Sequence, residues 1–248
     1  MKIVLNKKDL ISKFFNQITR ITDKCSLIIF SDHISCLTNT PDGNIILYGY
    51  YQAKTDLQLN ETAKLNLPAV DRLSRILDNI TEDEIELDIS SNCITYNKNE
   101  ITFKYYLLED GIISHSVIST EKISKLTFDC SFDVHYNKLN ELSKSGSFVG
   151  VDLPKIYFFI KDNKMFCEIT DKTLENIDSI TYQISEQVNG TQFSNFLPVE
   201  LEVFRMIALA CSKDEKITVK VNTIKKVLMI ELNKPNLTLK YIVSALVK

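Results

Sequence analysis

The fold is decided by the stretch Leu67-Pro68-Ala69-Val70-Asp71-Arg72-Leu73-Ser74-Arg75-Ile76-Leu77. Its apolar residues recur three or four positions apart, which predicts a helix with one apolar face over residues 67–80. Pro68 would stand in the first turn, where a helix tolerates proline. A counterpart starts 130 positions later at Leu197-Pro198, and the same offset carries Arg75 onto Arg205. This repetition is the first sign that the chain is built twice.

Three more helices and many short strands are expected. Apolar residues at helical spacing predict helices over residues 7–22, 136–145 and 198–211, the first with Asn6 as its N-cap. Most of the remaining sequence consists of short runs rich in Ile, Leu, Tyr and Thr, separated by turn residues. Residues 84–89 alternate strictly between acidic and apolar side chains. Such runs predict antiparallel hairpins.

The order of elements is the same in both halves, which predicts two duplicated domains. We expect a first domain over residues 1–108, a connector over 109–125 without helical periodicity, and a second domain over 126–248. Strands and helices in this order indicate the α+β class, with antiparallel sheets and two helices in each domain.

Composition limits the kind of protein. Apolar residues make up 44% and charged residues 25% of the chain, which is globular usage. No run of 18 apolar residues predicts a membrane span, and the charges of residues 1–9 precede no apolar signal segment, so we expect an intracellular protein with no membrane partner. The six cysteines lack C-x-x-C spacing and only three histidines occur, so we expect neither a metal site nor a cofactor.

Sequence motifs do not indicate an enzyme. The phosphate-binding patterns G-x-x-x-x-G-K-S/T and G-x-G-x-x-G are missing from the sequence, as is the nucleophile pattern G-x-S-x-G. Ser119 and Lys122 fit S-x-x-K, but no companion motif accompanies them, so chance explains the match better. The acidic residues 82–84 are interpreted as a solvated turn.

The predicted helices are more basic than the rest of the chain. Together they carry a net charge of +3, whereas the whole chain carries −3. The bias is modest, and ordinary solvated helix faces explain it equally well.

In order, spacing and length, the duplicated unit resembles the DNA sliding clamps of the two-domain kind, typified by proliferating cell nuclear antigen and the bacteriophage clamps. The resemblance covers essentially the whole chain. It includes residues 8–51, which resemble the first helix and meander of the family, the helix stretch quoted above, and Leu239-Lys240-Tyr241-Ile242-Val243, which resembles the closing strand.

The resemblance implies a non-enzymatic DNA polymerase processivity factor. Three subunits would form a closed homotrimeric ring whose helices line the hole and contact phosphates of double-stranded DNA without reading its sequence. A clamp loader and a DNA polymerase would be partners, at the site of DNA replication. The DNA-facing residues carried over by position are Lys8, Lys13, Arg20, Arg72, Arg75, Lys138, Lys144 and Arg205. Asp78 departs from the family, which often has a basic residue there.

The resemblance also implies an apolar outer pocket for a partner peptide. Its candidate residues are Ile45, Ile112, Ile113, Ile118, Tyr241, Ile242 and Ser244. Plain strand core is an equally good interpretation of Ile45, Tyr241 and Ile242. The connector differs from that of the cellular clamps and the C-terminus lacks their acidic tail, so the partner's motif stays open.

Subunit contacts implied by the family plan would join residues 100–108 of one chain to residues 179–186 of the next. Long uncovered edges are a liability in a monomer unless they are used.

Two other functions keep the same fold. A viral monomeric or dimeric processivity factor would hold DNA electrostatically, which requires a strongly basic face. A virus-specific transcription role is the other alternative. The low glycine content and many Lys and Asn residues favour a viral or phage source weakly, with a host cytoplasmic or nuclear location.

Overall fold

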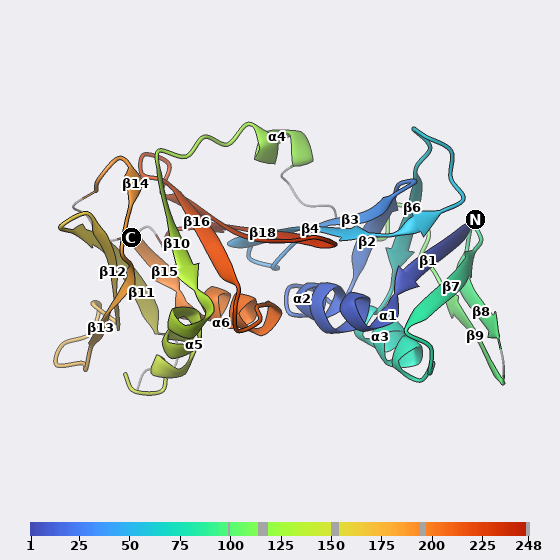
Figure 1. Cartoon of the computed structure of the whole chain (residues 1–248), viewed down its shortest axis with the longest axis horizontal. Coiled ribbons are helices and arrows are strands. Elements are labelled where there is room, and N and C mark those ends of the chain that lie inside the picture. The colour runs from blue at the N-terminus through green and yellow to red at the C-terminus, as the bar shows by residue number, and fades with distance from the viewer. Residues whose placement is uncertain (99, 114–118, 150–153, 194–196, 247–248) are drawn as a thin grey trace. The chain divides into compact units, whose positions relative to one another are not determined.

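The structure is a computed structural model that describes residues 1–98, 100–113, 119–149, 154–193 and 197–246. The chain divides into two compact units. The first consists of Met1–Ser124 with Asn233–Leu239, and the second of Lys125–Leu232 with Lys240–Lys248. Each unit combines antiparallel strands with helices (Figure 1), so the predicted α+β class is confirmed.

The first unit contains two groups of antiparallel strands. One is a five-stranded sheet in the order β5-β1-β7-β8-β9, and the other has the neighbours β4-β3-β2-β6. The strands are β1 (Lys2–Asn6), β2 (Cys25–Ile29), β3 (His33–Asn39), β4 (Ile45–Gln52), β5 (Lys54–Thr55), β6 (Ala63–Leu67), β7 (Glu84–Ile89), β8 (Cys93–Lys98) and β9 (Ile101–Tyr106).

The first helix of this unit is continuous but not uniform. It runs through α1 (Lys7–Asp9), the π-helical segment η1 (Leu10–Phe15) and α2 (Asn16–Thr19). The side chain of Asn6 accepts a hydrogen bond from the Asp9 amide at 3.1 Å, which confirms it as the N-cap. Apolar spacing alone does not distinguish a π turn from an α turn, so the six-residue π segment was not predicted.

The second helix of the first unit, α3, covers Val70–Asp78 and starts after the N-cap Ala69. Pro68 therefore precedes the helix instead of occupying its first turn, as the sequence had suggested. Pro68 lies between the end of β6 and the N-cap of α3. Proline has a fixed φ and no backbone N–H, and at this position the missing N–H removes no helical hydrogen bond.

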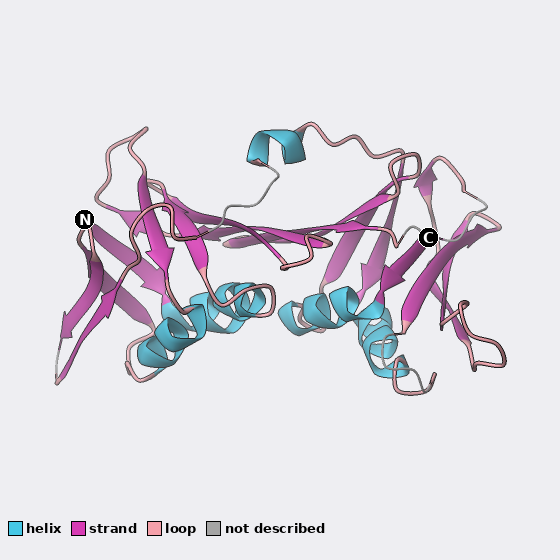
Figure 2. Ribbon diagram, turned by 180° about the vertical axis from the view of Figure 1, so that it is seen from behind, coloured by secondary structure: helices cyan, strands magenta, loops and turns pink. Residues whose placement is uncertain are grey.

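The first helix and α3 lie on the same side of strands β2, β3 and β4 in both views (Figures 1 and 2). Phe14 of η1 is fully buried, and its ring centroid lies 5.7 Å from that of Tyr51 in β4. Gly49, two positions earlier in β4, leaves the space that Phe14 fills, since a Cβ there would lie 2.7 Å from Cε2 of Phe14. A missing side chain thus sets how closely the helix approaches the sheet.

The second unit repeats this plan. It has a four-stranded sheet β13-β12-β11-β15 and the neighbours β14-β10-β16-β17-β18. The strands are β10 (Cys130–His135), β11 (Lys155–Lys161), β12 (Lys164–Thr170), β13 (Ile180–Ser185), β14 (Asn189–Gly190), β15 (Leu197–Glu200), β16 (Lys216–Asn222), β17 (Val227–Lys234) and β18 (Leu237–Ser244). Residues 233–234 of β17 and 237–239 of β18 belong to the first unit. Phe158 joins its core, with ring centroids 5.9 Å from Phe132 and 5.6 Å from Phe204.

The helices of the second unit agree with the sequence in number but not in every boundary. Helix α5 covers Tyr136–Ser145 as predicted. Helix α6 covers Leu201–Ala210, three residues later than the predicted start at Pro198. Residues 197–200 form β15 instead, where Val199 lies opposite Ile156 of β11 and is fully buried. Val199 fits the apolar spacing of a helix, but pairing with β11 decides its conformation.

The connector contains a helix that the sequence did not predict. Helix α4 covers Thr120–Ser124, and its Ile123 is buried. Five residues are too few to show helical periodicity, so this short element could not be recognised from the sequence.

Candidate nucleic-acid interface and edge strands

The first helix presents basic residues on the side opposite its core face. Leu10, Phe14 and Ile18 are fully buried, whereas Lys8 and Arg20 are exposed. Neither Lys8 nor Arg20 forms an ion pair with any residue that the structure describes. Both side chains are therefore available to an external anion.

The third basic residue of this face is already paired. Nζ of Lys13 lies 2.7 Å from the carboxylate of Asp9, one helical turn earlier. The two side chains remain about one third exposed, which makes this a surface ion pair of small energy. The pair lowers the effective positive charge of the helix without removing it.

The position of Lys7 changes the net charge of the first helix's outer face from the value counted in the sequence. Its side chain is buried, and its ammonium group donates a hydrogen bond to the carbonyl of Ile80, just beyond the end of α3. An ammonium near a helix C-terminus is favourable because it meets carbonyls without helical partners. Lys7 therefore links two helices and does not contribute to the outer face, whose charge is one unit less positive than the sequence count.

Helix α3 carries two predicted residues with different partners. The guanidinium of Arg72 lies 5.2 Å from the ring centroid of Tyr105, a cation–π contact, and the side chain stays exposed. Nη2 of Arg75 is 2.6 Å from the carboxylate of Asp71. Arg75 and the first helix line the same shallow hollow. The hollow is lined by Ile11, Ser12, Asn16, Thr19, Asp71, Ser74 and Arg75. Polar side chains of both helices thus share one surface.

The corresponding helix of the second unit repeats the pattern. Nζ of Lys138 lies 2.9 Å from the carboxylate of Glu141, three residues later in α5. Lys144 is exposed and has no ion-pair partner within the described part of the chain.

Arg205 is engaged inside the second unit. Its Nε donates to the carbonyl of Ser143 at 3.1 Å, and Nη1 lies 3.2 Å from the carboxylate of Glu202. The guanidinium also occupies the space next to Gly146, where a Cβ would lie 2.2 Å from Nη2. Arg205 therefore joins α6 to the end of α5, and only about a third of its side chain remains exposed.

The eight predicted basic residues thus fall into two groups. Lys13, Arg75, Lys138 and Arg205 each pair with a carboxylate of their own helix, three or four residues away. Lys8, Arg20, Arg72 and Lys144 are exposed and make no ion pair within the described residues. Exposed pairs at this spacing contribute about 0.3–0.5 kcal/mol, so a phosphate can displace the carboxylate at small cost.

The residues proposed for the partner pocket differ in exposure. Ile45, Tyr241 and Ile242 are buried, as strand core residues are. Ile112 is exposed, Ile113 is half-buried and Ser244 is exposed. Ile118 lies outside the described residues. The burial of the first three agrees with the core interpretation that the sequence left open.

Both strands expected at subunit contacts are the last strands of their sheets. Strand β9 ends the five-stranded sheet of the first unit, and β13 ends the four-stranded sheet of the second unit. The sequence had placed these strands at residues 100–108 and 179–186, which contain β9 and β13. A terminal strand carries a row of unpaired backbone groups that another chain can use.

A groove beside β13 had no signal in the sequence. Its volume is about 450 Å³, and it is lined by Asp133, His135, Asn137, Lys138, Gln183, Ile184, Ser185, Glu186, Gln187 and Asn189. Lys216 and Thr218 hold the carboxylate of Asp133, and these contacts outweigh burial and lower its pKa. The groove forms because β10 and β13, far apart in sequence, lie close together in the second unit.

Neither a metal-ligand cluster nor a reactive thiol at Cys130 or Cys167 occurs among the described residues. No three His, Cys, Asp or Glu side chains there gather as metal ligands. Burial raises the pKa of Cys130 to about 11 and that of Cys167 to about 12, so neither is a thiolate nucleophile near neutral pH. Among the described helices, none is long and apolar enough to cross a membrane.

The comparisons with known proteins give no match by sequence: neither a protein-family model nor a curated protein matches the chain. Solved structures match over the whole length. A. fulgidus PCNA, solved with the C-terminal region of FEN-1 bound, is 10% identical with a TM-score of 0.79, and the match covers 100% of this chain and 98% of that one. PCNA from Thermococcus kodakaraensis is 10% identical with a TM-score of 0.76, covering 99% of both chains.

A third similar structure is the PCNA2–PCNA3 complex from Sulfolobus tokodaii, with 13% identity, a TM-score of 0.73 and 99% coverage of both chains. Identities this low establish shared architecture only. From end to end, the chain has the two-domain fold of the PCNA sliding clamps, as its pattern of elements had predicted.

Proposed function

We propose that this protein is a DNA sliding clamp: a non-enzymatic subunit of a homotrimeric ring that encircles duplex DNA and tethers a DNA polymerase. The observation that carries the proposal is that a clamp fold over the whole chain leaves β9 and β13, one in each unit, as the last strands of the sheets that the structure describes. Two different edges on one chain allow head-to-tail association, which closes into a ring when the rotation fits.

The helix faces support weak, sequence-independent contact with DNA. Lysines and arginines contact phosphates but do not read bases from these positions. Half of the predicted basic residues are paired on their own helices. Such a surface attracts DNA without holding it at one place, which suits a ring that is retained by topology and slides.

The same observation disfavours a monomeric factor that holds DNA by charge. A protein without a topological link depends on many phosphate contacts, each adding to affinity and to salt dependence. Four self-paired residues out of eight, with Lys7 buried, leave too little free charge for that role.

Partner proteins are proposed by analogy with the similar structures. One PCNA was solved with the C-terminal region of FEN-1 bound, and two others as a PCNA2–PCNA3 complex. We infer that this chain likewise binds its own copies and presents an outer site to a polymerase and a loader, inside the cell where DNA is replicated. Ile112, Ile113 and Ser244 are the described pocket candidates that are accessible.

Light scattering across a dilution series tests the ring. A trimer has three times the 28.4 kDa mass of the subunit, about 85 kDa. A trimeric mass that persists to low micromolar concentration supports the ring. A mass of one subunit at all concentrations refutes it.

A further inference from the structure

We propose that Tyr105 of β9 is a positioning residue that holds the guanidinium of Arg72 ready to bind a DNA phosphate. The proposal rests on the proposed function, since it concerns how helix α3 meets DNA. Two contacts of one side chain carry it. The hydroxyl group of Tyr105 holds the start of α3, and its ring lies against Arg72 in the first turn of that helix.

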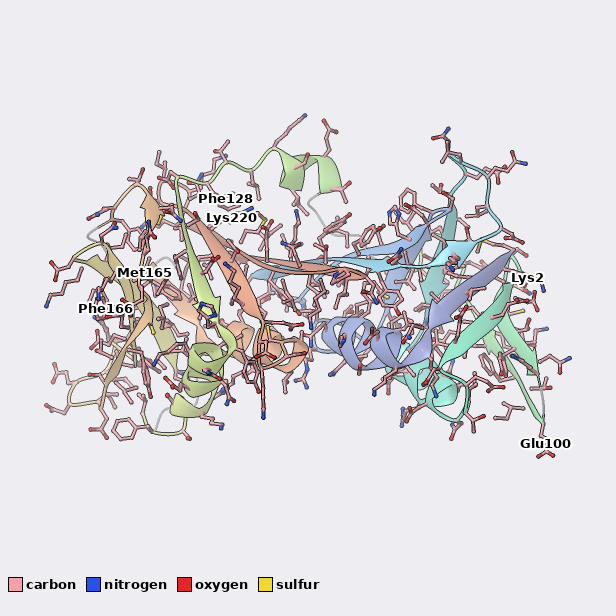
Figure 3. The ribbon with its side chains drawn as sticks, viewed as in Figure 1. Lys2, Glu100, Phe128, Met165, Phe166 and Lys220 are labelled. Carbon is pink, nitrogen blue, oxygen red and sulfur yellow. The ribbon has the colours of Figure 1, made fainter. Side chains whose placement is uncertain are left out.

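Tyr105 reaches α3 from a strand that is distant in the sequence. Strand β9 starts after Glu100, which marks the end of the β8–β9 hairpin in Figure 3, and Tyr105 lies near the opposite end of the strand. Its side chain is only 2% exposed, and in the ladder the residue lies opposite Ile94 of β8. Closely packed side chains keep one rotamer, so this ring is a fixed support for whatever contacts it.

The hydroxyl group of Tyr105 holds the N-cap residue of α3. It accepts a hydrogen bond from the Ala69 amide at 3.0 Å and donates one to the Ala69 carbonyl at 2.7 Å. Burial raises the pKa of Tyr105, so the hydroxyl group keeps the proton that it donates. Ala69 has no side-chain oxygen to cap the helix. The sheet thus fixes the position of the helix start, although the N-cap residue itself provides no side-chain hydrogen bond.

The ring of Tyr105 supports the side chain of Arg72. Cζ of Arg72 lies 5.2 Å from the ring centroid, within the range of about 6 Å for a cation–π contact. Arg72 itself is exposed. A guanidinium has five N–H donors in a planar fork, so contact with one ring leaves donors for a phosphate. The contact therefore orders the side chain without occupying all of its binding groups.

This support distinguishes Arg72 from the other predicted DNA-facing residues. Within the described part of the chain, the other cation–π contacts involve Lys104 and Lys172, which are not among the eight. A long side chain that is free in solution loses rotamer freedom when it binds, which lowers the affinity roughly two- to tenfold for each side chain. Because Arg72 is already ordered by the ring, its contact with a phosphate avoids part of this loss.

The affinity for a short labelled DNA duplex, measured by fluorescence anisotropy, tests the role of the ring. We expect Tyr105→Leu to weaken binding roughly two- to tenfold for each subunit that contacts the duplex. The loss should persist in an Arg20→Ala background, which removes another exposed charge from the proposed DNA-facing surface, and should vanish in an Arg72→Ala background. An equal loss in the Arg72→Ala background overturns the proposal, because the tyrosine then acts only through the fold. Unchanged or tighter binding by a folded Tyr105→Leu variant overturns it as well.

Tyr157→Leu is the matched control. Tyr157 is buried, its hydroxyl group accepts a hydrogen bond from the Lys172 amide at 3.3 Å, and Nζ of Lys172 lies 4.9 Å from the ring centroid. Since Lys172 is not a predicted DNA-facing residue, this variant should bind the duplex as the wild type does. A loss as large as that of Tyr105→Leu overturns the proposal.

Tyr105→Phe separates the two contacts of the tyrosine. Phenylalanine keeps the ring but removes the hydroxyl group that bonds to Ala69. We expect a lower melting temperature with most of the DNA affinity retained. A loss of affinity equal to that of Tyr105→Leu, in a folded protein, overturns the role of the ring.

The wild type gives a second test that holds even if Tyr105→Leu does not fold. The sequence contains four arginines, so four Nε–Hε NMR signals are expected, and single Arg→Lys variants assign them. We expect the order parameter of Arg72 in the DNA-free protein to exceed that of Arg20, which has neither an ion pair nor a ring contact within the described residues. An order parameter for Arg72 no higher than that of Arg20 overturns the proposal.

The same measurements separate this proposal from the proposed function. A wild type that stays monomeric and does not bind the duplex refutes the proposed function. A trimeric wild type that binds the duplex, with Arg72→Ala binding equally well, overturns only the role given to Arg72 and Tyr105.

Discussion

Removing the carboxylate beside Arg75 should strengthen DNA binding. The Asp71 carboxylate lies 2.6 Å from the guanidinium, and the two side chains are 50% and 77% exposed. An exposed pair at this spacing is worth about 0.3–0.5 kcal/mol, which a phosphate must replace before it uses Arg75. We expect Asp71→Asn to gain about 0.5 kcal/mol per subunit. If all three subunits contact DNA, the gain is about 1.5 kcal/mol, or roughly tenfold in affinity.

The assay is fluorescence anisotropy of a short labelled duplex with open ends, measured over a series of salt concentrations. An open-ended duplex reports the contacts themselves, because topology does not retain the protein on it. Each added phosphate contact should steepen the dependence of log K on log salt by about 0.9. Asp71 lies in the first turn of α3, where its charge stabilises the helix by about 0.3–1 kcal/mol, so the variant's melting temperature is measured in parallel.

Glu86→Gln is the matched control. Glu86 pairs with Lys2 at 2.5 Å and is 51% exposed, but it lies on strand β7 instead of a helix. Both substitutions change the net charge by one unit, so only position distinguishes them. Equal gains in affinity from the two variants, or no gain from Asp71→Asn in a folded protein, would refute the assignment of α3 to the DNA-facing surface.

Two further predictions concern stability. Gly49→Ala places a Cβ 2.7 Å from the Phe14 ring, and overpacking of this kind lowers the free energy of unfolding by about 1–3 kcal/mol. Urea denaturation should show this loss of stability, and the loss should be smaller in a Phe14→Leu background if the Phe14 ring causes it. An unchanged denaturation midpoint would contradict the contact. The Asp171 carboxylate accepts hydrogen bonds from Thr173 and pairs with Lys155, which lowers its pKa to about 2. This stabilisation is present above the ordinary carboxyl pKa and is lost as the pH falls from about 4 through 2. The difference in free energy of unfolding between the wild type and Asp171→Asn should therefore shrink in that interval. A difference that does not change with pH would contradict the prediction.

The sequence predicted the elements that its side-chain periodicity determines. The helices around Leu73 and Leu139 and the alternating strand 84–89 are where periodicity places them, because one face of each is buried. The positions of β9 and β13 at the ends of their sheets agree with what the family resemblance implied for residues 100–108 and 179–186.

Other features depend on contacts between residues distant in sequence. Helix α6 starts later than predicted because β11 pairs with residues 197–200. Lys7 does not lie on the outer face because its ammonium group donates a hydrogen bond to the carbonyl of Ile80. Neither partner is visible in a local window of sequence. The pairing of Asp71 with Arg75 is different, since their spacing of four on a predicted helix already contains that information.

The register shift in β13 has a consequence for a single copy of the chain. Strands β9 and β13 end the sheets of the described residues, and flat strand edges promote aggregation of many copies. The irregularity opposite Met165 interrupts the edge of β13, and Lys104 places a charge on the edge of β9. Bulges and edge lysines both make poor templates for indefinite strand addition. We therefore expect a single copy to resist fibril-like growth, while the regular part of the edge stays open to the one partner that the proposed ring requires.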